Sequence, residues 1–244
     1  MLNLRDNERL DDLQNGYEII QNPEYFCFGM DAILLSHYVN MMGDKRVLDL
    51  GSGNGIIPVM LAALTKSTYI RGLEIQPYNV DLASRSIEHN NIVDRAQVIQ
   101  GDIRDASKLF EASSFDIVVT NPPYMKSVAG VKNESDARTI ARHEVLCSLE
   151  DVISAASAVL KTNGRFYMVH RPLRLVEIFS LMRNYHLEPK RMQLVYPYVD
   201  KEPNMVLIEG IKGAKPEMRV DKPLIVYKQG GEYTQQLLDI YSSK

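Results

Sequence analysis

The tetrapeptide Asn121-Pro122-Pro123-Tyr124 could activate a poorly nucleophilic amine. An exocyclic amine on an aromatic base is a weak nucleophile because its lone pair is delocalised into the ring. The side-chain oxygen of Asn121 and the carbonyl of Pro122 could each accept one amine N–H and turn the lone pair towards a methyl donor. The prolines stiffen the turn and fix both acceptors before substrate arrives, and Tyr124 can stack on a flat base. The pattern indicates methylation of an amine.

A glycine-rich segment upstream, Asp49-Leu50-Gly51-Ser52-Gly53-Asn54-Gly55, suggests where a cofactor would bind. Glycines permit a tight turn and the close approach of a ligand. The dinucleotide fingerprint G-x-G-x-x-G would require a glycine at position 56, and here the third glycine comes one residue earlier. The carboxylate of Asp49 would repel a pyrophosphate and attract an ammonium group. The segment therefore favours a zwitterionic, cationic cofactor, although plain turn chemistry can also select such glycines.

Two further acids follow the next two expected strands. Glu74 could accept both hydroxyl hydrogens of a ribose, and Asp102 could accept from an adenine amine. Ile75 and Ile103 follow these acids and could enclose an adenine ring, or they could be ordinary core residues. One acid alone could be an exposed loop residue, but three acids at three successive strand ends indicate a nucleoside cofactor.

Short β-rich runs alternate with helical runs from residue 46 onward, and this alternation must position these side chains. It predicts an α/β fold with a doubly wound, mostly parallel sheet of seven strands, whose ligands lie at the carboxyl ends of the strands. Ser148 and Asp151 resemble a capping box, and Gly164 stands where the helix behind them should stop. The expected strands are residues 46–50, 68–74, 96–100, 115–120, 165–169, 191–198 and 205–211, and the expected helices start near 31, 57, 79, 149 and 173.

Length and composition bound the class of protein. The 244 residues are 45% hydrophobic and 24% charged, which is typical of a globular chain. The longest apolar run, residues 56–64, is too short to span a bilayer, residues 1–13 lack the layout of a signal peptide, and no metal-ligand spacing is evident. We expect a cytoplasmic protein with an amino-terminal extension over residues 1–45, a central domain over 46–212 and a carboxyl-terminal extension over 213–244.

The charge is unevenly distributed, although the net charge is only −3. Residues 1–31 are acidic, and residues 161–191 carry a net positive charge. This pattern describes either two solvated faces or one face suited to phosphates. Among the candidate phosphate contacts, His143 could equally be an ordinary surface histidine. These candidates are Lys126, Arg142, His143 and Arg171.

The combined motifs resemble those of the S-adenosylmethionine-dependent methyltransferases of class I that modify amino groups. The outer segments 19–21, 28–35 and 141–144 narrow the resemblance to the bacterial tRNA(Val) adenine-37 N6-methyltransferase family, over residues 10–210 or thereabouts. The resemblance implies a Rossmann-like sheet whose last strand is antiparallel. It also implies S-adenosyl-L-methionine as cofactor and structured RNA, above all tRNA, as partner. The implied cofactor-binding residues are Asp49, Gly51, Gly53, Gly55, Glu74, Ile75, Asp102 and Ile103, and the implied catalytic residues are Asn121, Pro122 and Tyr124.

Several other functions remain open at this point. A protein glutamine N5-methyltransferase would use the same tetrapeptide on an amide, but such enzymes carry a longer helical region than the 48 residues that precede Asp49 here. Guanine N2-methylation of ribosomal RNA, and a non-catalytic RNA-binding module, also fit the motifs. Methylation of pyrimidine carbon 5 is disfavoured because neither Cys27 nor Cys147 has a neighbouring proline.

Overall fold

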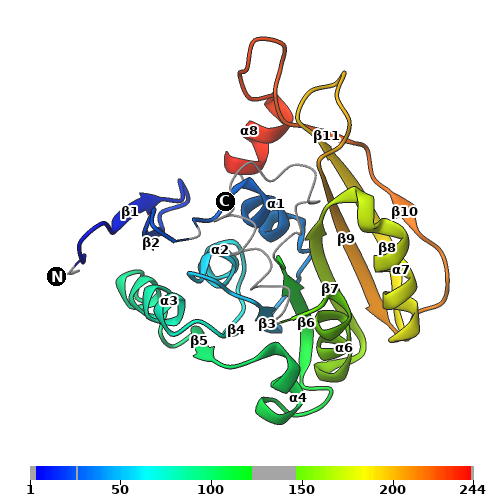
Figure 1. Ribbon diagram of the computed structural model, residues 1–244, viewed down its shortest axis with the longest axis horizontal. Helices are drawn as coiled ribbons and strands as arrows, with labels where there is room; N and C mark the ends of the chain where they lie inside the picture. Colours follow the sequence, from blue (N-terminus) through cyan, green and yellow to red (C-terminus); the bar gives the residue numbers. More distant parts are fainter. Residues whose placement is uncertain (1–3, 26, 123–146, 243–244) are drawn as a thin grey trace, which may run out of the picture.

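The computed structural model describes residues 4–25, 27–122 and 147–242, and it centres on one twisted sheet (Figure 1). Seven strands form the body of this sheet in the order β5-β4-β3-β6-β7-β9-β8. They are all parallel to their neighbours except β9, which runs antiparallel to both β7 and β8. The doubly wound sheet with an antiparallel last strand is therefore confirmed. The strands are β3 (Arg46–Leu50), β4 (Tyr69–Glu74), β5 (Ala96–Gln100), β6 (Phe115–Thr120), β7 (Leu160–His170), β8 (Leu187–Tyr196) and β9 (Met205–Lys212).

Helices cover both faces of the sheet, and each face has its own apolar core. The first core joins the sheet to α1, α2 and α3, and the second joins it to α4, α6 and α7. Strands buried on both faces are largely apolar, which explains the run Ile117–Val119 within β6. The helices are α1 (Met30–Tyr38), α2 (Ile56–Leu64), α3 (Pro77–His89), α4 (Ala106–Leu109), α6 (Leu149–Val159) and α7 (Leu175–Asn184). No helix in the described part of the chain is long and apolar enough to cross a membrane.

The capping box at the start of α6 is present, but Gly164 does not end that helix as expected. The Ser148 side chain accepts from the Asp151 N–H, and the Asp151 carboxylate accepts from the Ser148 N–H. The helix then stops at Val159, and Gly164 lies within the long strand β7. A Cβ on Gly164 would come 2.8 Å from the Lys161 carbonyl oxygen. Glycine is needed there because backbone packs closely within the strand, and not because a helix ends.

An amino-terminal hairpin that the sequence did not predict packs against α3. It pairs β1 (Arg9–Asp12) with β2 (Glu18–Gln21) in antiparallel register. The backbone N–H of Ile20 donates to the Ser86 hydroxyl at 3.0 Å, and the guanidinium of Arg85 pairs with Glu8 at 2.6 Å. These contacts tie the extension to the surface of the central domain.

The carboxyl-terminal extension lengthens the sheet beyond the seven expected strands. Two short strands, β10 (Arg219–Val220) and β11 (Leu224–Ile225), pair in parallel with β8, and α8 (Gln235–Ser242) follows them. Within the described residues, the sheet therefore has nine strands. The two added strands cover the edge of β8, whose backbone groups would otherwise lack partners.

A buried acid joins three parts of the chain at this end of the sheet. The side chain of Glu209 on β9 is only 5% exposed and forms ion pairs with Arg165 on β7 and Arg191 on β8. Arg191 also donates to the Tyr38 carbonyl at 2.6 Å, at the end of α1. Arg191 is itself 17% exposed, and its other acid, Asp221, lies further away at 3.7 Å. The loss of Glu209 would therefore leave a largely buried charge poorly compensated.

We therefore predict that Glu209→Gln lowers the free energy of unfolding by about 3 kcal/mol, near the lower end of the cost of breaking a buried pair. Urea unfolding followed by circular dichroism measures this difference. The matched control is Glu232→Gln, because Glu232 is 81% exposed in its pair with Lys228. It should leave the unfolding free energy unchanged, and equal values for the two variants would contradict the prediction.

Candidate active site

The backbone geometry of the turn after β3 requires its three glycines. Gly51, Gly53 and Gly55 all have positive φ angles, of 79°, 53° and 84°. Gly55 also packs so closely on α3 that a Cβ would come 2.8 Å from the Ala83 Cβ. In contrast, a Cβ on Gly53 would meet nothing within 4 Å. The turn thus combines a fixed backbone with an open side at Gly53.

Glu74, at the end of β4, is held by the backbone around it. One of its carboxylate oxygens accepts from the Gly53 N–H at 2.8 Å, and the other accepts from the Gln76 N–H at 2.8 Å. The residue is only 6% exposed. Each oxygen retains a second lone-pair direction, so the fixed carboxylate can still accept from ligand hydroxyls.

Asp49 is fully buried at the end of β3 without a compensating hydrogen bond. Both carboxylate oxygens lack a hydrogen-bond partner among the described residues. The Ser52 hydroxyl donates instead to the Asp49 main-chain carbonyl, at 3.3 Å. Burial, and to a lesser extent the negative charge of Glu74, raises the pKa of Asp49 to about 7. A cationic ligand at the turn would compensate this carboxylate, so the donor set fits an ammonium group.

Asp102 lies at the predicted strand end, but its carboxylate already has a cationic partner. It caps the short helix η1 (Ile103–Asp105) by accepting from the Arg104 N–H at 2.9 Å, and it pairs with the Arg104 guanidinium. Hydrogen bonds from Arg104 hold the pKa of this carboxyl below its usual value. Ile103 lies 3.8 Å from the position that a Gly51 Cβ would take, while Ile75 follows Glu74 and is half-buried.

Strand pairing brings Asn121 beside the glycine turn. In the parallel register of β3 and β6, Leu50 stands opposite Thr120, and the Thr120 hydroxyl donates to the Leu50 carbonyl at 2.8 Å. Gly51 and Asn121 are the next residues of the two strands, so the turn and the tetrapeptide begin side by side. Asn121 is half-buried. This placement is what the amine-activating interpretation requires.

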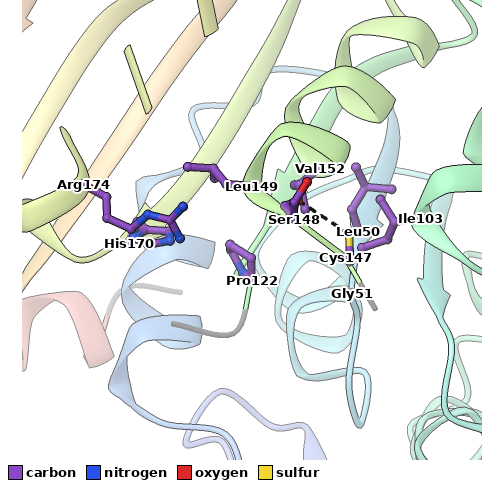
Figure 2. A pocket seen from close by; sticks show the side chains of 10 residues that line it. All are labelled: Leu50, Gly51, Ile103, Pro122, Cys147, Ser148, Leu149, Val152, His170 and Arg174. Atoms are coloured by element: carbon purple, nitrogen blue, oxygen red, sulfur yellow. Dashed lines mark hydrogen bonds between the residues drawn. The ribbon is translucent and has the colours of Figure 1, made fainter. Parts of the chain in front are cut away.

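A cavity at this edge of the sheet joins the two motifs to residues that sequence reasoning missed (Figure 2). Among these, His170 ends β7 and Arg174 ends the short helix η3 (Pro172–Arg174). The available signal was the position of His170 at the end of an expected strand beside residues 115–120. The cavity is lined by Leu50, Gly51, Ile103, Pro122, Cys147, Ser148, Leu149, Val152, His170 and Arg174.

The surroundings of His170 in this cavity favour its neutral form. Its Nδ1 accepts from the Arg171 N–H at 2.8 Å, and the residue is only 1% exposed. Burial, and to a lesser extent the positive charge of Arg174, lowers the pKa of His170 to about 4.

Several predicted substrate contacts lie outside the described residues, and most cations of the basic segment 161–191 are already paired with acids. Pro123, Tyr124, Lys126, Arg142 and His143 fall in the range 123–146, which the structure does not describe. Arg171 lies at the site edge, where its guanidinium donates to the Asn204 carbonyl at 2.8 Å. Most other cations of the segment pair with acids: Lys161 with Asp116, Arg165 and Arg191 with Glu209, Arg174 with Glu177, and Arg183 with Glu188. Lys190 donates to the Lys215 carbonyl at 3.1 Å.

Comparison with known protein families agrees with this geometry. The family model described as methyltransferase small domain matches residues 28–185, which is more than half of the chain. This protein belongs to that methyltransferase family. The matched range contains the glycine turn, Glu74, Asp102, Asn121 and His170.

Two relatives carry the same name. A tRNA1(Val) (adenine(37)-N6)-methyltransferase from Porphyromonas gingivalis is 34% identical over 199 residues, covering 79% of this chain and 77% of the relative. One of the same name from Haemophilus influenzae is 28% identical, covering 92% of this chain and 93% of the relative.

Solved structures share the methyltransferase fold. A predicted O-methyltransferase from Agrobacterium tumefaciens aligns with a TM-score of 0.72 at 23% identity, covering 88% of this chain and 96% of that one. The geranyl diphosphate C-methyltransferase from Streptomyces coelicolor, solved with S-adenosyl-L-homocysteine, aligns with a TM-score of 0.57 at 17% identity. It covers 75% of this chain and 77% of that one.

The raised pKa of Asp49 predicts a particular pH dependence of stability. The unfolded carboxyl titrates near 4 and the folded one near 7, so between these values the folded state holds a proton that the unfolded state releases. Stability from this group therefore falls as pH rises from about 4 to about 7. Asp49→Asn removes this pH dependence. The free energy of unfolding of the variant minus that of wild type should therefore be larger at pH 8 than at pH 5. Urea unfolding at both pH values measures the difference, and a pH-independent difference would contradict the assignment.

Proposed function

We propose that this protein transfers a methyl group from S-adenosyl-L-methionine to the exocyclic N6 amine of an adenine in tRNA. The observation that carries the proposal is the placement of Asn121 and Pro122 directly beside the glycine turn, at the switch point of the sheet. The two candidate acceptors for the amine and the turn proposed to hold the cofactor then lie at the same edge of the sheet. The names of the tRNA-modifying relatives support the substrate class.

The cofactor would be held by the three strand ends β3, β4 and β5. When bound, it supplies a methyl group on a positively charged sulfur. The Asp49 carboxylate would compensate the cofactor's ammonium group, and the fixed oxygens of Glu74 would accept its ribose hydroxyls. Asp102 would accept from the cofactor adenine, for which its pair with Arg104 must rearrange. Ile75 and Ile103 would enclose the ring.

The chain's own contribution to the reaction is to position and polarise the amine. The Asn121 side-chain oxygen and the Pro122 carbonyl would accept the two amine N–H groups and direct the lone pair towards the methyl group. No strong base is required, because the nitrogen becomes acidic once it is methylated and can release its extra proton to water. The tetrapeptide would thus act through fixed acceptors, and Tyr124 would stack on the base.

A base inside a folded tRNA must first leave its stack. Its extrusion into the cavity beside Pro122 would cost a few kcal/mol, and less for a base in a loop. We infer that Lys126, Arg142, His143 and Arg171 contact the RNA around that base. We also propose a cytoplasmic location, which fits a protein that modifies tRNA.

Incubation with a labelled methyl donor tests the proposed substrate. Purified protein is given total tRNA, ribosomal RNA or release-factor protein, each in a separate reaction, and the labelled product is digested to nucleosides or amino acids. We expect N6-methyladenosine from tRNA. Label in guanosine from ribosomal RNA, or in glutamine from protein, would replace the proposal with one of the two alternatives that share the tetrapeptide.

We predict that Asn121→Ala lowers the single-turnover methylation rate by roughly 10²–10³-fold, as for the loss of one preorganised polar contact. Cofactor affinity, measured by calorimetry, should change little, because the cofactor contacts lie on β3, β4 and β5. The matched control is Asn184→Ala at the exposed end of α7, which should keep the wild-type rate. An Asn121→Ala enzyme that turns over at the wild-type rate would refute the mechanism.

A further inference from the structure

His170 stands level with Pro122 on the neighbouring strand. In the parallel register of β6 and β7, Thr120 is opposite Met168, which sets Pro122 and His170 at the same height. Both residues line the same cavity, and Figure 2 shows His170 and Arg174 next to Pro122. The His170 ring therefore borders the space next to one of the two proposed amine acceptors.

The hydrogen bonding of this ring fixes what its other nitrogen can do. Nδ1 accepts from the Arg171 N–H, so it carries no proton. A neutral imidazole then carries its single proton on Nε2, which can only donate. The lowered pKa agrees with a neutral ring at pH 7. The Arg171 N–H thus selects the tautomer in which His170 is a donor.

We propose that His170 recognises the target base by donating from Nε2 to the adenine ring nitrogen N1, an inference that rests on the proposed function. In adenine, N1 is bonded to the carbon that bears the reacting amine, and it is an acceptor. In guanine, the amine-bearing carbon is bonded to two ring nitrogens: N1 carries a hydrogen and is a donor, whereas N3 is an acceptor. A fixed donor therefore pairs with adenine N1 and opposes a base that presents a carbon or a hydrogen-bearing nitrogen at that place. His170 would thus orient adenine with its N6 amine towards Pro122.

The consequence of losing this contact is a change in specificity. A buried donor left without its acceptor penalises the wrong base in the transition state by about 10- to 100-fold in kcat/KM. A purely structural role for His170 would lower activity on every base equally. The two roles are separated by changing the base and the histidine together.

The experiment uses the full chain and tRNA transcripts whose target adenine is replaced by 1-deazaadenine or 7-deazaadenine. With wild-type protein, we expect 1-deazaadenine to lower kcat/KM by about 10- to 100-fold and 7-deazaadenine to leave it nearly unchanged. His170→Phe keeps a ring but removes the donor, so its kcat/KM for adenine should fall and 1-deazaadenine should cause no further loss. His170→Ala gives the same test if the larger ring prevents folding.

Two further variants complete the design. His170→Gln can place an amide N–H near the former Nε2, so it should restore part of the sensitivity to 1-deazaadenine. Leu173→Ala, at a side chain that is 92% exposed, should keep the wild-type ratio between adenine and 1-deazaadenine.

The outcomes separate this inference from the proposed function. If wild-type protein methylates adenine and the 1-deazaadenine penalty is absent, or persists in His170→Phe and His170→Ala, the inference is wrong and the proposed function stands. Wild-type protein that does not methylate the unmodified adenine transcript overturns the proposed function, and the inference with it.

Discussion

The parallel pairing of β3 with β6 is the constraint on which the site depends. The Leu50–Thr120 register, reinforced by the Thr120 hydroxyl, makes the glycine turn and Asn121 leave the sheet side by side. The strand order reverses at this pair, with β4 and β5 beyond β3 on one side and β7 beyond β6 on the other. The connections that follow β3 and β6 therefore leave towards opposite faces of the sheet, and the edge between them stays open. A shift of one residue in this register would turn every side chain of β6 to the other face and would separate the two motifs.

The acidic side chains at this edge of the sheet favour the binding of a ligand more than they favour stability. Asp49 is buried without a hydrogen-bond partner among the described residues, which costs free energy and raises its pKa to about 7. Glu74, in contrast, is held by two backbone N–H groups. Elsewhere in the described chain a buried acid such as Glu209 has its cations in place. The difference between Asp49 and Glu209 is what singles out the turn as a site for a cation.

The sequence predicted the parts of the molecule that local chemistry determines. The limits of β3, β5 and β6 follow from apolar runs bounded by polar residues, and the Ser148–Asp151 cap follows from its spacing. The close packing of Gly164 within β7, and the cover that β10 and β11 give to β8, depend on contacts between distant segments. The same holds for the surroundings of His170, because Pro122 comes next to it only once β7 lies beside β6. The spacing of apolar residues along the sequence carries no information about contacts between distant segments.

The most direct measurement of the central claim is a crystal structure of the protein with S-adenosyl-L-homocysteine and adenosine. The account predicts that the adenosine N6 amine lies about 2.6–3.2 Å from both the Asn121 side-chain oxygen and the Pro122 carbonyl. It also predicts that the cofactor sulfur faces the other side of that nitrogen, across the glycine turn. An amine bound away from these two oxygens, or an Asn121 side chain turned away from the glycine turn, would contradict the account.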